Sequence, residues 1–321
     1  MTVDVESVAP TVLITDARVR YTERLSAAFV RVTLESDGFR DLGIEGFDTR
    51  FKIVFPGATG ELPGISDDPE DWYAAWLAMP EASRSPMRTY TVRDVLEEGG
   101  VRALVVDLVV HERGPHGPAC RWALAARPGD VVHVIAPHRA GQEYGGTEFA
   151  PGERRDLLLV ADETALPALT RIIGDMAPDF TGHAFVEVPS ADDVLDLSVP
   201  GAVEVTWLAR GAAEHGRRLV DAVRRHLGLG TLEPGALRAE LPSDLDVEVW
   251  ETPRYSSSGE DVTAQARRPV VGSDLQGLYA WIAGESWLVK ALRRSLVTEL
   301  EVDRAQVAFM GYWREGVSMK S

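Results

Sequence analysis

The middle of the chain reads LLLVADETALPA from residue 157 to residue 168. Its five leading apolar residues predict a strand that is buried on both faces of a parallel sheet. A helix should follow, with Thr164 as its N-cap and Pro167 in its first turn. Asp162, Thr164 and Ala165 are then expected at the carboxyl end of a parallel strand, where open α/β sheets bind ligands. The segment has no GxGxxG pattern, so a dinucleotide would not be held here in the usual Rossmann manner.

Beyond this segment, strand and helix patterns alternate toward the end of the chain. We expect strands at 183–188, 203–208, 278–283 and 307–312, and helices at 165–176, 213–227 and 286–300. This alternation predicts a doubly wound α/β domain over residues 151–321. An irregular insertion at 231–269, which contains Ser256-Ser257-Ser258-Gly259, is expected to form a loop.

The first 135 residues have the pattern of an antiparallel β domain. Short strands are expected at 17–34, 50–55, 88–95, 101–111 and 130–136, with glycine and proline turns between them and a short helix at 67–79. These segments predict a barrel or a sandwich over residues 1–150, and hence a two-domain α+β protein. The polar, turn-rich stretch 137–156 is the candidate domain boundary.

Composition narrows the class of protein. A chain of 321 residues, 45% of them hydrophobic, can bury the cores of two domains. The net charge of -17 argues against a nucleic-acid-binding surface, which needs clustered lysine and arginine. The single cysteine, Cys120, excludes an intrachain disulfide and a multi-cysteine metal site. With no apolar run of membrane-spanning length and no signal-peptide pattern, we expect a cytoplasmic protein without membrane insertion.

Arg88-Thr89-Tyr90-Thr91 is the first segment that could bind a ligand. In a strand, Arg88 and Tyr90 share one face while Thr89 and Thr91 share the other. Arginine offers a planar donor fork for phosphate, tyrosine a flat ring, and threonine a hydroxyl for a ring nitrogen or carbonyl. A polar strand on a barrel surface would account for the same residues equally well.

A turn and a short helix beginning near Pro118 form the second candidate segment. Proline suits the first helical turn, and the free N–H groups at a helix N-terminus can bind an anion such as a diphosphate. The structural alternative is a turn with Trp122 in the core. Cys120 and His111 fit buried structural residues better than a catalytic pair, because no third group is evident to orient them.

Two further candidate segments lie at strand ends near the C-terminus. Gly284 would permit the close approach of a ligand, and Ser286 would cap the following helix. The basic residues of that helix, Lys290, Arg293 and Arg294, fit a solvated face better than a site. The aromatic pair in GYWREG, residues 311–316, could pack over a flat ligand or belong to an edge strand.

The order of these segments is more specific than any one of them. RTYTVR (88–93), VVHERGPHGPACRWA (109–123), ADETALPA (161–168), AWIAGES (280–286) and GYWREG (311–316) together resemble the siderophore-interacting protein family. That family is a branch of the ferredoxin–NADP reductase superfamily, and the resemblance covers residues 19–316. It implies an N-terminal antiparallel β-barrel that binds FAD, followed by an α/β domain with a parallel sheet for NAD(P)H.

The resemblance also implies a function and a set of site residues. Members bind FAD noncovalently, take electrons from NADPH, NADH or reduced ferredoxin, and reduce ferric siderophores so that Fe(II) is released. It assigns cofactor binding to Arg88, Tyr90, Thr91, Val109, His111, Pro118, Ala119, Trp122, Asp162, Thr164, Ala165, Trp207, Arg210, Trp281, Gly284 and Glu285. It assigns siderophore binding to Lys52, Arg139 and Arg314. The protein need not ligate iron, and its seven histidines show no 2-His-1-carboxylate pattern.

Two other functions stay open at this point. One is a flavin reductase of the same superfamily that passes electrons to a different acceptor, such as a quinone or a partner protein. The other is a non-catalytic module that carries or senses a siderophore or a flavin. Bound FAD would argue against most binding-only functions, and the acceptor that re-oxidises it would separate the two reductases.

Overall fold

The computed structural model describes residues 10–57, 59–66, 68, 71–81, 84–110, 117–141, 146–232, 249–253 and 275–317. Its contacts divide the chain into two compact units between Thr147 and Glu148, inside the stretch where the sequence places a boundary. Within the described ranges, no helix has the length and hydropathy needed to cross a membrane. Each unit has its own sheet and its own hydrophobic core.

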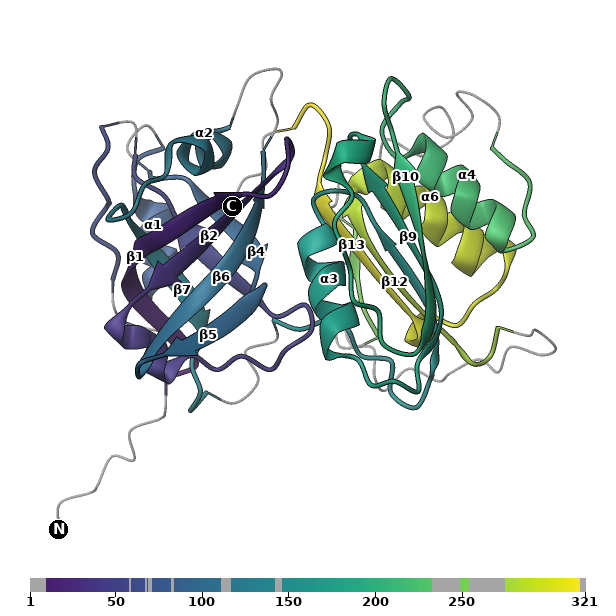
Figure 1. The fold of residues 1–321 in the computed structure, drawn as a ribbon, viewed down its shortest axis with the longest axis horizontal. Coiled ribbons are helices and arrows are strands. Elements are labelled where there is room, and N and C mark those ends of the chain that lie inside the picture. The colour runs from purple at the N-terminus through teal and green to yellow at the C-terminus, as the bar shows by residue number, and fades with distance from the viewer. Residues whose placement is uncertain are drawn as a thin grey trace, which may run out of the picture. The chain divides into compact units, whose positions relative to one another are not determined.

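The first unit contains a seven-stranded antiparallel sheet in the order β4-β3-β7-β1-β2-β6-β5 (Figure 1). Its strands are β1 (Val12–Arg24), β2 (Phe29–Glu35), β3 (Arg50–Val54), β4 (Met87–Thr91), β5 (Asp94–Glu98), β6 (Val101–Val109) and β7 (Val131–Pro137). The segment expected at 17–34 covers two strands, because the chain turns where the N–H of Leu25 donates to the carbonyl of Phe29. A 3₁₀ helix, η1 (Asp37–Asp41), follows β2.

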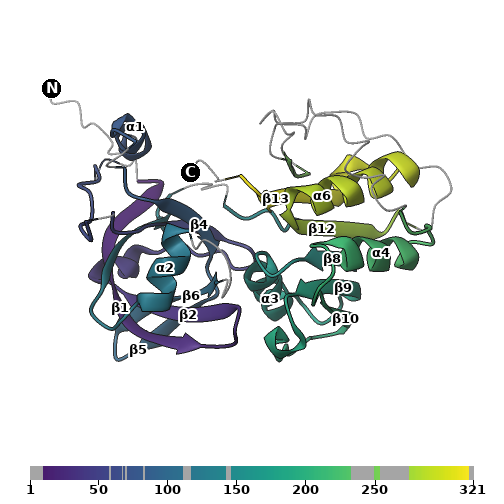
Figure 2. The same cartoon turned by 90° about the horizontal axis from the view of Figure 1, so that it is seen from above.

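This sheet is curled (Figure 2). Its two edge strands, β4 and β5, are consecutive in the chain, and only Val92 and Arg93 lie between them. The N–H of Val92 donates to the carbonyl of Thr49, next to β3. The N–H of the adjacent Arg93 donates to the carbonyl of Val105 in β6, near the opposite edge. Two adjacent residues therefore bond to strands near the two opposite edges of the sheet. The predicted barrel is confirmed as a curled antiparallel sheet.

The two faces of the curled sheet bury different clusters. Helix α1 (Trp72–Ala78) covers one face, where Trp72 and Trp76 pack with Val54 and Met87. The other face encloses the main cluster, which includes Phe51, Phe55, Leu104, Val106 and Val134. Helix α2 (Pro118–Ala125) packs against this second cluster through Ala123, with Ala119, Cys120 and Trp122 at its margin.

The second unit contains a six-stranded mixed sheet in the order β10-β9-β8-β12-β13-β11. Five strands are parallel, as expected: β8 (Asp156–Ala161), β9 (Thr181–Val188), β10 (Ala202–Ala209), β12 (Leu278–Glu285) and β13 (Val307–Trp313). The two-residue strand β11 (Trp250–Glu251) pairs antiparallel with β13. It lies inside the insertion expected to be irregular, so that expectation is wrong at these two residues. The rest of 233–274 lies outside the described residues, apart from Val249, Thr252 and Pro253.

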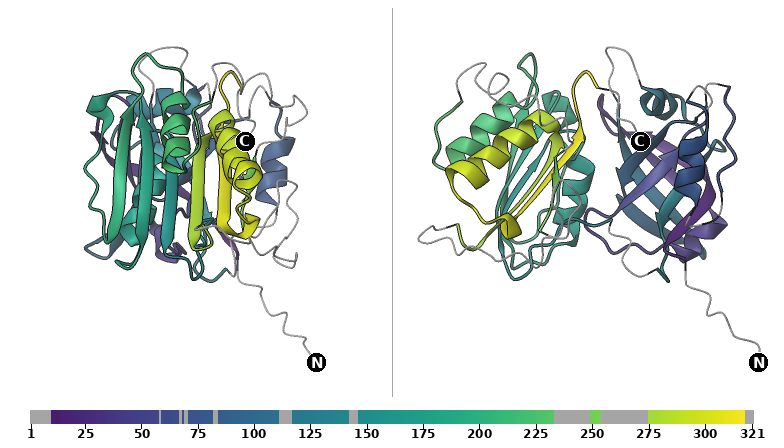
Figure 3. Two further views of the ribbon diagram at one scale, coloured as in Figure 1. Left: turned by 90° about the vertical axis from the view of Figure 1, so that its right-hand side faces the viewer. Right: turned by 180° about the vertical axis from the view of Figure 1, so that it is seen from behind.

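Helices cover both faces of this sheet, as a doubly wound domain requires (Figures 2 and 3). Helix α3 (Leu166–Asp175) lies on one face, while α4 (Arg217–His226) and α6 (Ser286–Arg293) lie side by side on the other. Leu219, Val220 and Val223 of α4 share a core with Leu288 and Leu292 of α6. Two short 3₁₀ helices, η2 (Ala191–Asp193) and η4 (Arg304–Gln306), connect other elements.

The helix expected at 286–300 is not α-helical throughout. It changes after Arg293 into a π-helical turn, η3 (Arg294–Glu299). Ser295 lies at this change: its hydroxyl donates to the carbonyl of Ala291 at 3.2 Å and accepts a bond from Arg224 at 2.6 Å. A serine that bonds the preceding turn competes with the backbone ladder and bends a helix, which gives a physical reason for the wider turn.

Candidate functional site

In the first unit, β4 and α2 bring the two upstream candidate segments together. Tyr90 lies opposite Phe51 in the pairing of β3 with β4 and meets the Phe55 ring edge-on, with ring centres 6.2 Å apart. The ring of Phe55 lies 5.1 Å from that of Trp122 on α2. Tyr90 and Trp122 therefore border one aromatic cluster, although 31 residues separate them in the sequence.

The predicted alternation along β4 is observed. Tyr90 packs against the main core cluster, whereas Met87 packs on the face that α1 covers. Thr89 is exposed, and Thr91 is buried at the end of the strand opposite Arg50. Burial raises the pKa of the Tyr90 phenol, the charge of Arg88 opposes this, and Cys120 adds to it. Tyr90 is thus a neutral hydroxyl at physiological pH, half-buried and able to donate a hydrogen bond.

The first turn of α2 is suited to an anion. Gly117 is the N-cap, Pro118 follows as the first helical residue, and no described side chain bonds the cap. No acidic side chain occupies the first turn, so nothing in it neutralises the positive end of the helix dipole. Ala119 lies half-buried in this turn, and Val109 ends β6 opposite Phe29. His111 lies outside the described residues.

These features fit FAD in both of its parts. A half-buried tyrosine beside an arginine offers a plane and a charge for the flavin ring and its phosphate arm. The N-terminus of α2 offers backbone donors for a diphosphate. Both lie in the first unit, at the margin of one core cluster.

Two of the basic residues predicted to bind substrate, Lys52 and Arg139, lie in the first unit and have different partners. Lys52 Nζ donates to Thr89 Oγ1 at 2.9 Å, on the face of β4 opposite to Tyr90. Burial, and then the charge of Arg50, lower the pKa of Lys52. Arg139 pairs with Asp41 at 3.2 Å and lines a pocket of about 290 Å³.

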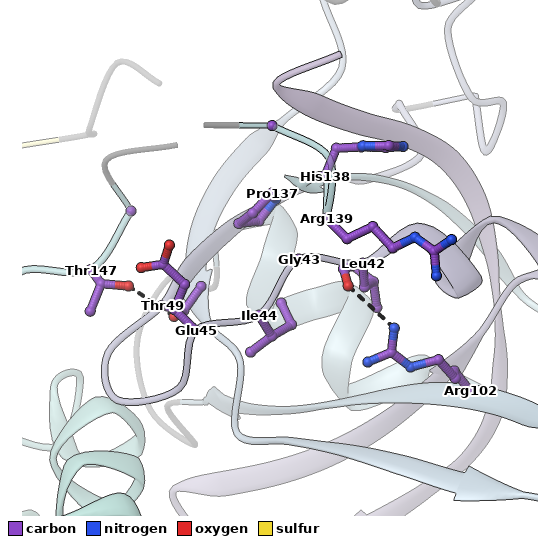
Figure 4. A pocket seen from close by; sticks show the side chains of 12 residues that line it. Leu42, Gly43, Ile44, Glu45, Thr49, Arg102, Pro137, His138, Arg139 and Thr147 are labelled. Atoms are coloured by element: carbon purple, nitrogen blue, oxygen red, sulfur yellow. Dashed lines mark hydrogen bonds between the residues drawn. The ribbon is translucent and has the colours of Figure 1, made fainter. Parts of the chain in front are cut away.

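Figure 4 shows this pocket, with Arg139 from the segment after β7 and Arg102 from β6. Arg102 donates to the carbonyl of Leu42 at 3.2 Å, and Thr49 bonds Thr147 at 2.9 Å. The other lining residues are Gly43, Ile44, Glu45, Pro137, His138, Gly141 and Gly146. Both arginines of the pocket are paired with carboxylates outside its lining: Arg139 with Asp41, and Arg102 with Glu97 at 3.1 Å.

In the second unit, polar groups gather at the carboxyl end of β8. The Asp162 carboxylate is completely buried and accepts bonds from the N–H of Thr164, the Thr164 hydroxyl and the N–H of Glu285. It also accepts from the Trp313 indole N–H at 3.0 Å. Burial, and then neighbouring Glu163, raise the pKa of Asp162 against the opposing effect of His215. Asp162 thus ties the end of β8 to the ends of β12 and β13.

Glu163 lies beside Asp162 and is paired with two cations. Both terminal nitrogens of Arg210 donate hydrogen bonds to the Glu163 carboxylate, at 2.8 and 2.9 Å. One of them also donates to Glu187 Oε1 at 3.1 Å. His215 Nε2 lies 3.3 Å from Glu163 and 3.6 Å from Asp162. Burial alone would raise the pKa of Glu163, but hydrogen bonds from His215 and Arg210 outweigh it and hold the pKa at about 2.

Asp162, Glu163 and His215 place their ligand atoms close enough to hold a metal ion. The bonds to these atoms argue against one. Arg210 occupies both oxygens of Glu163, and peptide, hydroxyl and indole donors surround Asp162. We therefore interpret the three residues as a charge-compensated cluster that organises the carboxyl edge of the sheet.

Several predictions at this edge need correction. Thr164 does not cap α3; Ala165 is the N-cap, and the Asp162 carboxylate accepts the N–H groups of both. Glu285 caps α6 by accepting the N–H of Trp287, whereas the predicted cap, Ser286, donates to the carbonyl of Trp313. Gly284 does permit a close approach, but by the Asp162 carboxylate: a Cβ there would lie 2.7 Å from Oδ2.

The remaining predicted nucleotide contacts differ in their exposure. Trp281 is completely buried in β12. Trp207 is half-buried on the edge strand β10. Arg210 is held by two carboxylates, and Arg314 is exposed just after β13.

Sequence reasoning missed three members of the buried cluster: Glu163, Glu187 and His215. Glu187 stands out within the otherwise apolar run 184–188, and an acidic residue in a buried strand signals a partner. Glu163 lies in the segment 157–168, but the sequence alone gives it no role distinct from that of Asp162. His215 gave no local signal, because its partners lie more than 50 residues away.

A larger hollow, of about 440 Å³, lies at the amino-terminal edge of the second unit's sheet, beside His183 and His226. Ligands of open α/β sheets bind at the carboxyl edge instead. We therefore assign the cluster around Asp162, and not this hollow, to the candidate site of the second unit.

A curled antiparallel sheet followed by a doubly wound α/β unit is a two-domain fold that is also seen in a solved ferredoxin reductase, which is 15% identical and superposes with a TM-score of 0.52 over 94% of this chain and 70% of that one. Residues 18–141 match the siderophore-interacting FAD-binding domain, and residues 154–316 match the siderophore-interacting protein domain. The chain belongs to the siderophore-interacting protein family. FAD is the cofactor that its first domain binds.

Similar proteins agree with this assignment. The NADPH-dependent ferric-chelate reductase of Escherichia coli is 31% identical over 91% of this chain and 89% of its own length. The ferric vibriobactin reductase ViuB of Vibrio cholerae is 26% identical over 98% and 93%. The structure of a siderophore utilization protein from T. fusca, 29% identical, superposes with a TM-score of 0.67 over 98% of this chain and 97% of that one. Mycobacterial relatives that are 36% identical are matched over 63% of their length.

Proposed function

We propose that this protein is an FAD-dependent ferric-siderophore reductase that takes electrons from NADPH or NADH. The observation that carries the proposal is the meeting of Tyr90, Phe55 and Trp122 beside the N-terminus of α2. This arrangement suits FAD, and it lies in the domain whose family description names that cofactor. The names of the relatives in E. coli and V. cholerae supply the acceptor class, a ferric chelate.

The chain's own residues would divide the work. Arg88 would bind the phosphate arm of the flavin, Tyr90 would hold the ring, and the backbone N–H of Ala119 would bind the diphosphate. Bound FAD supplies the chemistry of accepting two electrons and releasing them singly. Ferric iron in the chelate is the substrate and needs one electron, and the ferrous product is held less tightly by oxygen ligands. We therefore assign no protein ligand to iron.

The second unit offers a place for the electron donor. A nicotinamide nucleotide would approach the carboxyl edge of the sheet, near Asp162 and Thr164, as in other doubly wound domains. Arg210 is committed to Glu163 and Glu187, so we do not assign it to a nucleotide phosphate. The E. coli relative's name favours NADPH. Reduced ferredoxin is the other donor that the experiment below must compare.

We propose that the ferric chelate is contacted by Lys52, Arg139 and Arg314. Siderophore complexes with catecholate or carboxylate groups are anionic, and the chain as a whole is strongly acidic. Local cations would therefore provide the electrostatic complementarity that orients such a substrate.

Steady-state formation of Fe(II) tests the proposal. The flavin-loaded protein is mixed with a ferric siderophore, a chromogenic ferrous chelator and one of three donors: NADPH, NADH or reduced ferredoxin. We expect coloured ferrous complex to form with a nicotinamide donor at a rate proportional to protein concentration. Oxidation of the donor without formation of Fe(II) would show that the acceptor is wrong.

A further inference from the structure

Arg314 is exposed, yet the residues on both sides of it are hydrogen-bonded to buried groups. The indole N–H of Trp313 donates to Asp162 Oδ2 at 3.0 Å, and the hydroxyl of Ser286 donates to the carbonyl of Trp313 at 2.9 Å. On the other side, the N–H of Glu315 donates to Glu285 Oε1 at 3.1 Å. These three bonds reach the ends of β8 and β12.

A bulge precedes this segment. In the pairing of β12 with β13, Gly284 lies opposite Gly311, but Glu285 lies opposite Trp313, so Tyr312 is an extra residue. Tyr312 stacks on Trp250 of β11 at 5.9 Å, whereas Trp313 meets His215 edge-on at 5.0 Å. Bulges of this kind bend a strand end and re-aim the side chains that follow it.

The groups that hold the segment are themselves rigid. Asp162, Glu285 and Ser286 are each at most 5% exposed. Asp162 has additional bonds from Thr164 and from the N–H of Glu285. A long cationic side chain loses binding energy when it must be ordered, so a fixed backbone lowers the cost of using it.

We propose that Asp162 and Ser286, acting through Trp313, are positioning residues that fix Arg314 as a specificity determinant for anionic ferric chelates. This inference rests on the proposed function and goes beyond it. The positioning residues do not touch the substrate; they set the direction from which Arg314 meets it.

The test compares four variants of the flavin-loaded protein: Trp313→Phe, Ser286→Ala, Arg314→Ala and the double variant Trp313→Phe/Arg314→Ala. Phenylalanine keeps a ring beside His215 but removes the donor to Asp162. The substrates are a trianionic ferric tris-catecholate and an uncharged ferric tris-hydroxamate. The control is Arg304→Ala, which removes an exposed arginine of η4 in the same unit.

We expect Trp313→Phe and Ser286→Ala each to raise the KM for the trianionic chelate about three- to ten-fold, with kcat changed less than about two-fold. The KM for the uncharged chelate and the flavin content should stay unchanged, as should both KM values of the control. The double variant should match Arg314→Ala, because the first substitution acts only through Arg314.

Three results would overturn the inference. Equal rises of KM for both chelates would indicate general disruption, and effects that multiply in the double variant would show that Trp313 acts independently. An unchanged KM in Trp313→Phe and Ser286→Ala, with a raised KM in Arg314→Ala, would show that Arg314 needs no positioning. If the unmodified protein reduced neither chelate, the proposed function itself would fail, and this inference with it.

Discussion

Gly284 and Asp162 are in direct contact at the carboxyl edge of the second unit's sheet. Gly284 has a φ of 146°, and the N–H of the following residue, Glu285, donates to Asp162 Oδ2 at 2.7 Å. A Cβ on Gly284 would lie 2.7 Å from both Cγ and Oδ2 of Asp162. The contact lets one buried carboxylate join three parallel strands, and glycine is the residue that leaves room for it.

Gly284→Ala should therefore destabilise the protein by about 3 kcal/mol, from the steric conflict together with the unfavourable φ. The measurement is urea unfolding followed by circular dichroism. Gly211→Ala is the matched control, since Gly211 also has a positive φ, 58°, but no atom within 4 Å of the added carbon. The control should cost about 1 kcal/mol. Equal losses in the two variants would refute the role of the Asp162 contact.

His215 should make stability depend on pH. Burial lowers its pKa, but the hydrogen bond with Glu163 and the charge of Asp162 outweigh this and raise the pKa of His215 above its ordinary value. Its stabilising effect is then complete below about pH 6.5, its unfolded pKa, and is lost as pH rises through the folded pKa. Unfolding free energies of the unmodified protein and of His215→Gln should converge as pH rises from 6 to about 9. A constant difference would contradict the prediction.

Arg88→Ala should lose FAD during purification, because it removes the cation proposed for the phosphate arm. We expect FAD affinity to fall at least about ten-fold, measured by fluorescence titration of the apoprotein with FAD. Thr89→Val is the control on the same strand, since Thr89 lies on the opposite face, bonded to Lys52. Full flavin occupancy in Arg88→Ala, or equal loss in both variants, would remove Arg88 from the site.

Lys52→Ala should raise the KM for an anionic ferric chelate about three-fold without changing flavin content. Because burial lowers the pKa of Lys52, its charge disappears at lower pH than for an exposed lysine. The difference in KM between the variant and the unmodified protein should therefore shrink as the pH rises, and it should do so below the ordinary lysine pKa of about 10.4. Arg18→Ala, on an exposed part of β1, is the control. A KM that Lys52→Ala does not change would exclude contact with the substrate.

Much of the fold follows from local patterns in the sequence. The apolar run 157–161 forms the buried parallel strand that it predicts, because a strand covered on both faces needs no polar residues. The alternation at 88–91 places Tyr90 and Thr89 on opposite faces, because the period of a strand is fixed by its geometry. The helix N-terminus at Pro118 also follows from local chemistry.

What the sequence could not predict depends on partners distant in the chain. The pairing of Arg210 with Glu163 and Glu187 is an example, because neither carboxylate lies near Arg210 in the sequence. Ser286 looks like a cap, but the carbonyl of Trp313 is the acceptor that its hydroxyl finds. Such choices are decided by tertiary contacts, which residue types and spacing do not encode locally.

An anaerobic two-stage titration of the flavin spectrum tests whether this protein passes electrons from NADPH through FAD to a ferric siderophore. The purified protein is first reduced with NADPH, which should bleach the visible absorption of the flavin. A solution of a ferric siderophore, freed of dissolved oxygen, is then added. We expect the absorption to return as Fe(II) forms, with two equivalents of iron reduced for each flavin that is oxidised. Flavin that stays reduced in excess ferric siderophore would contradict this expectation.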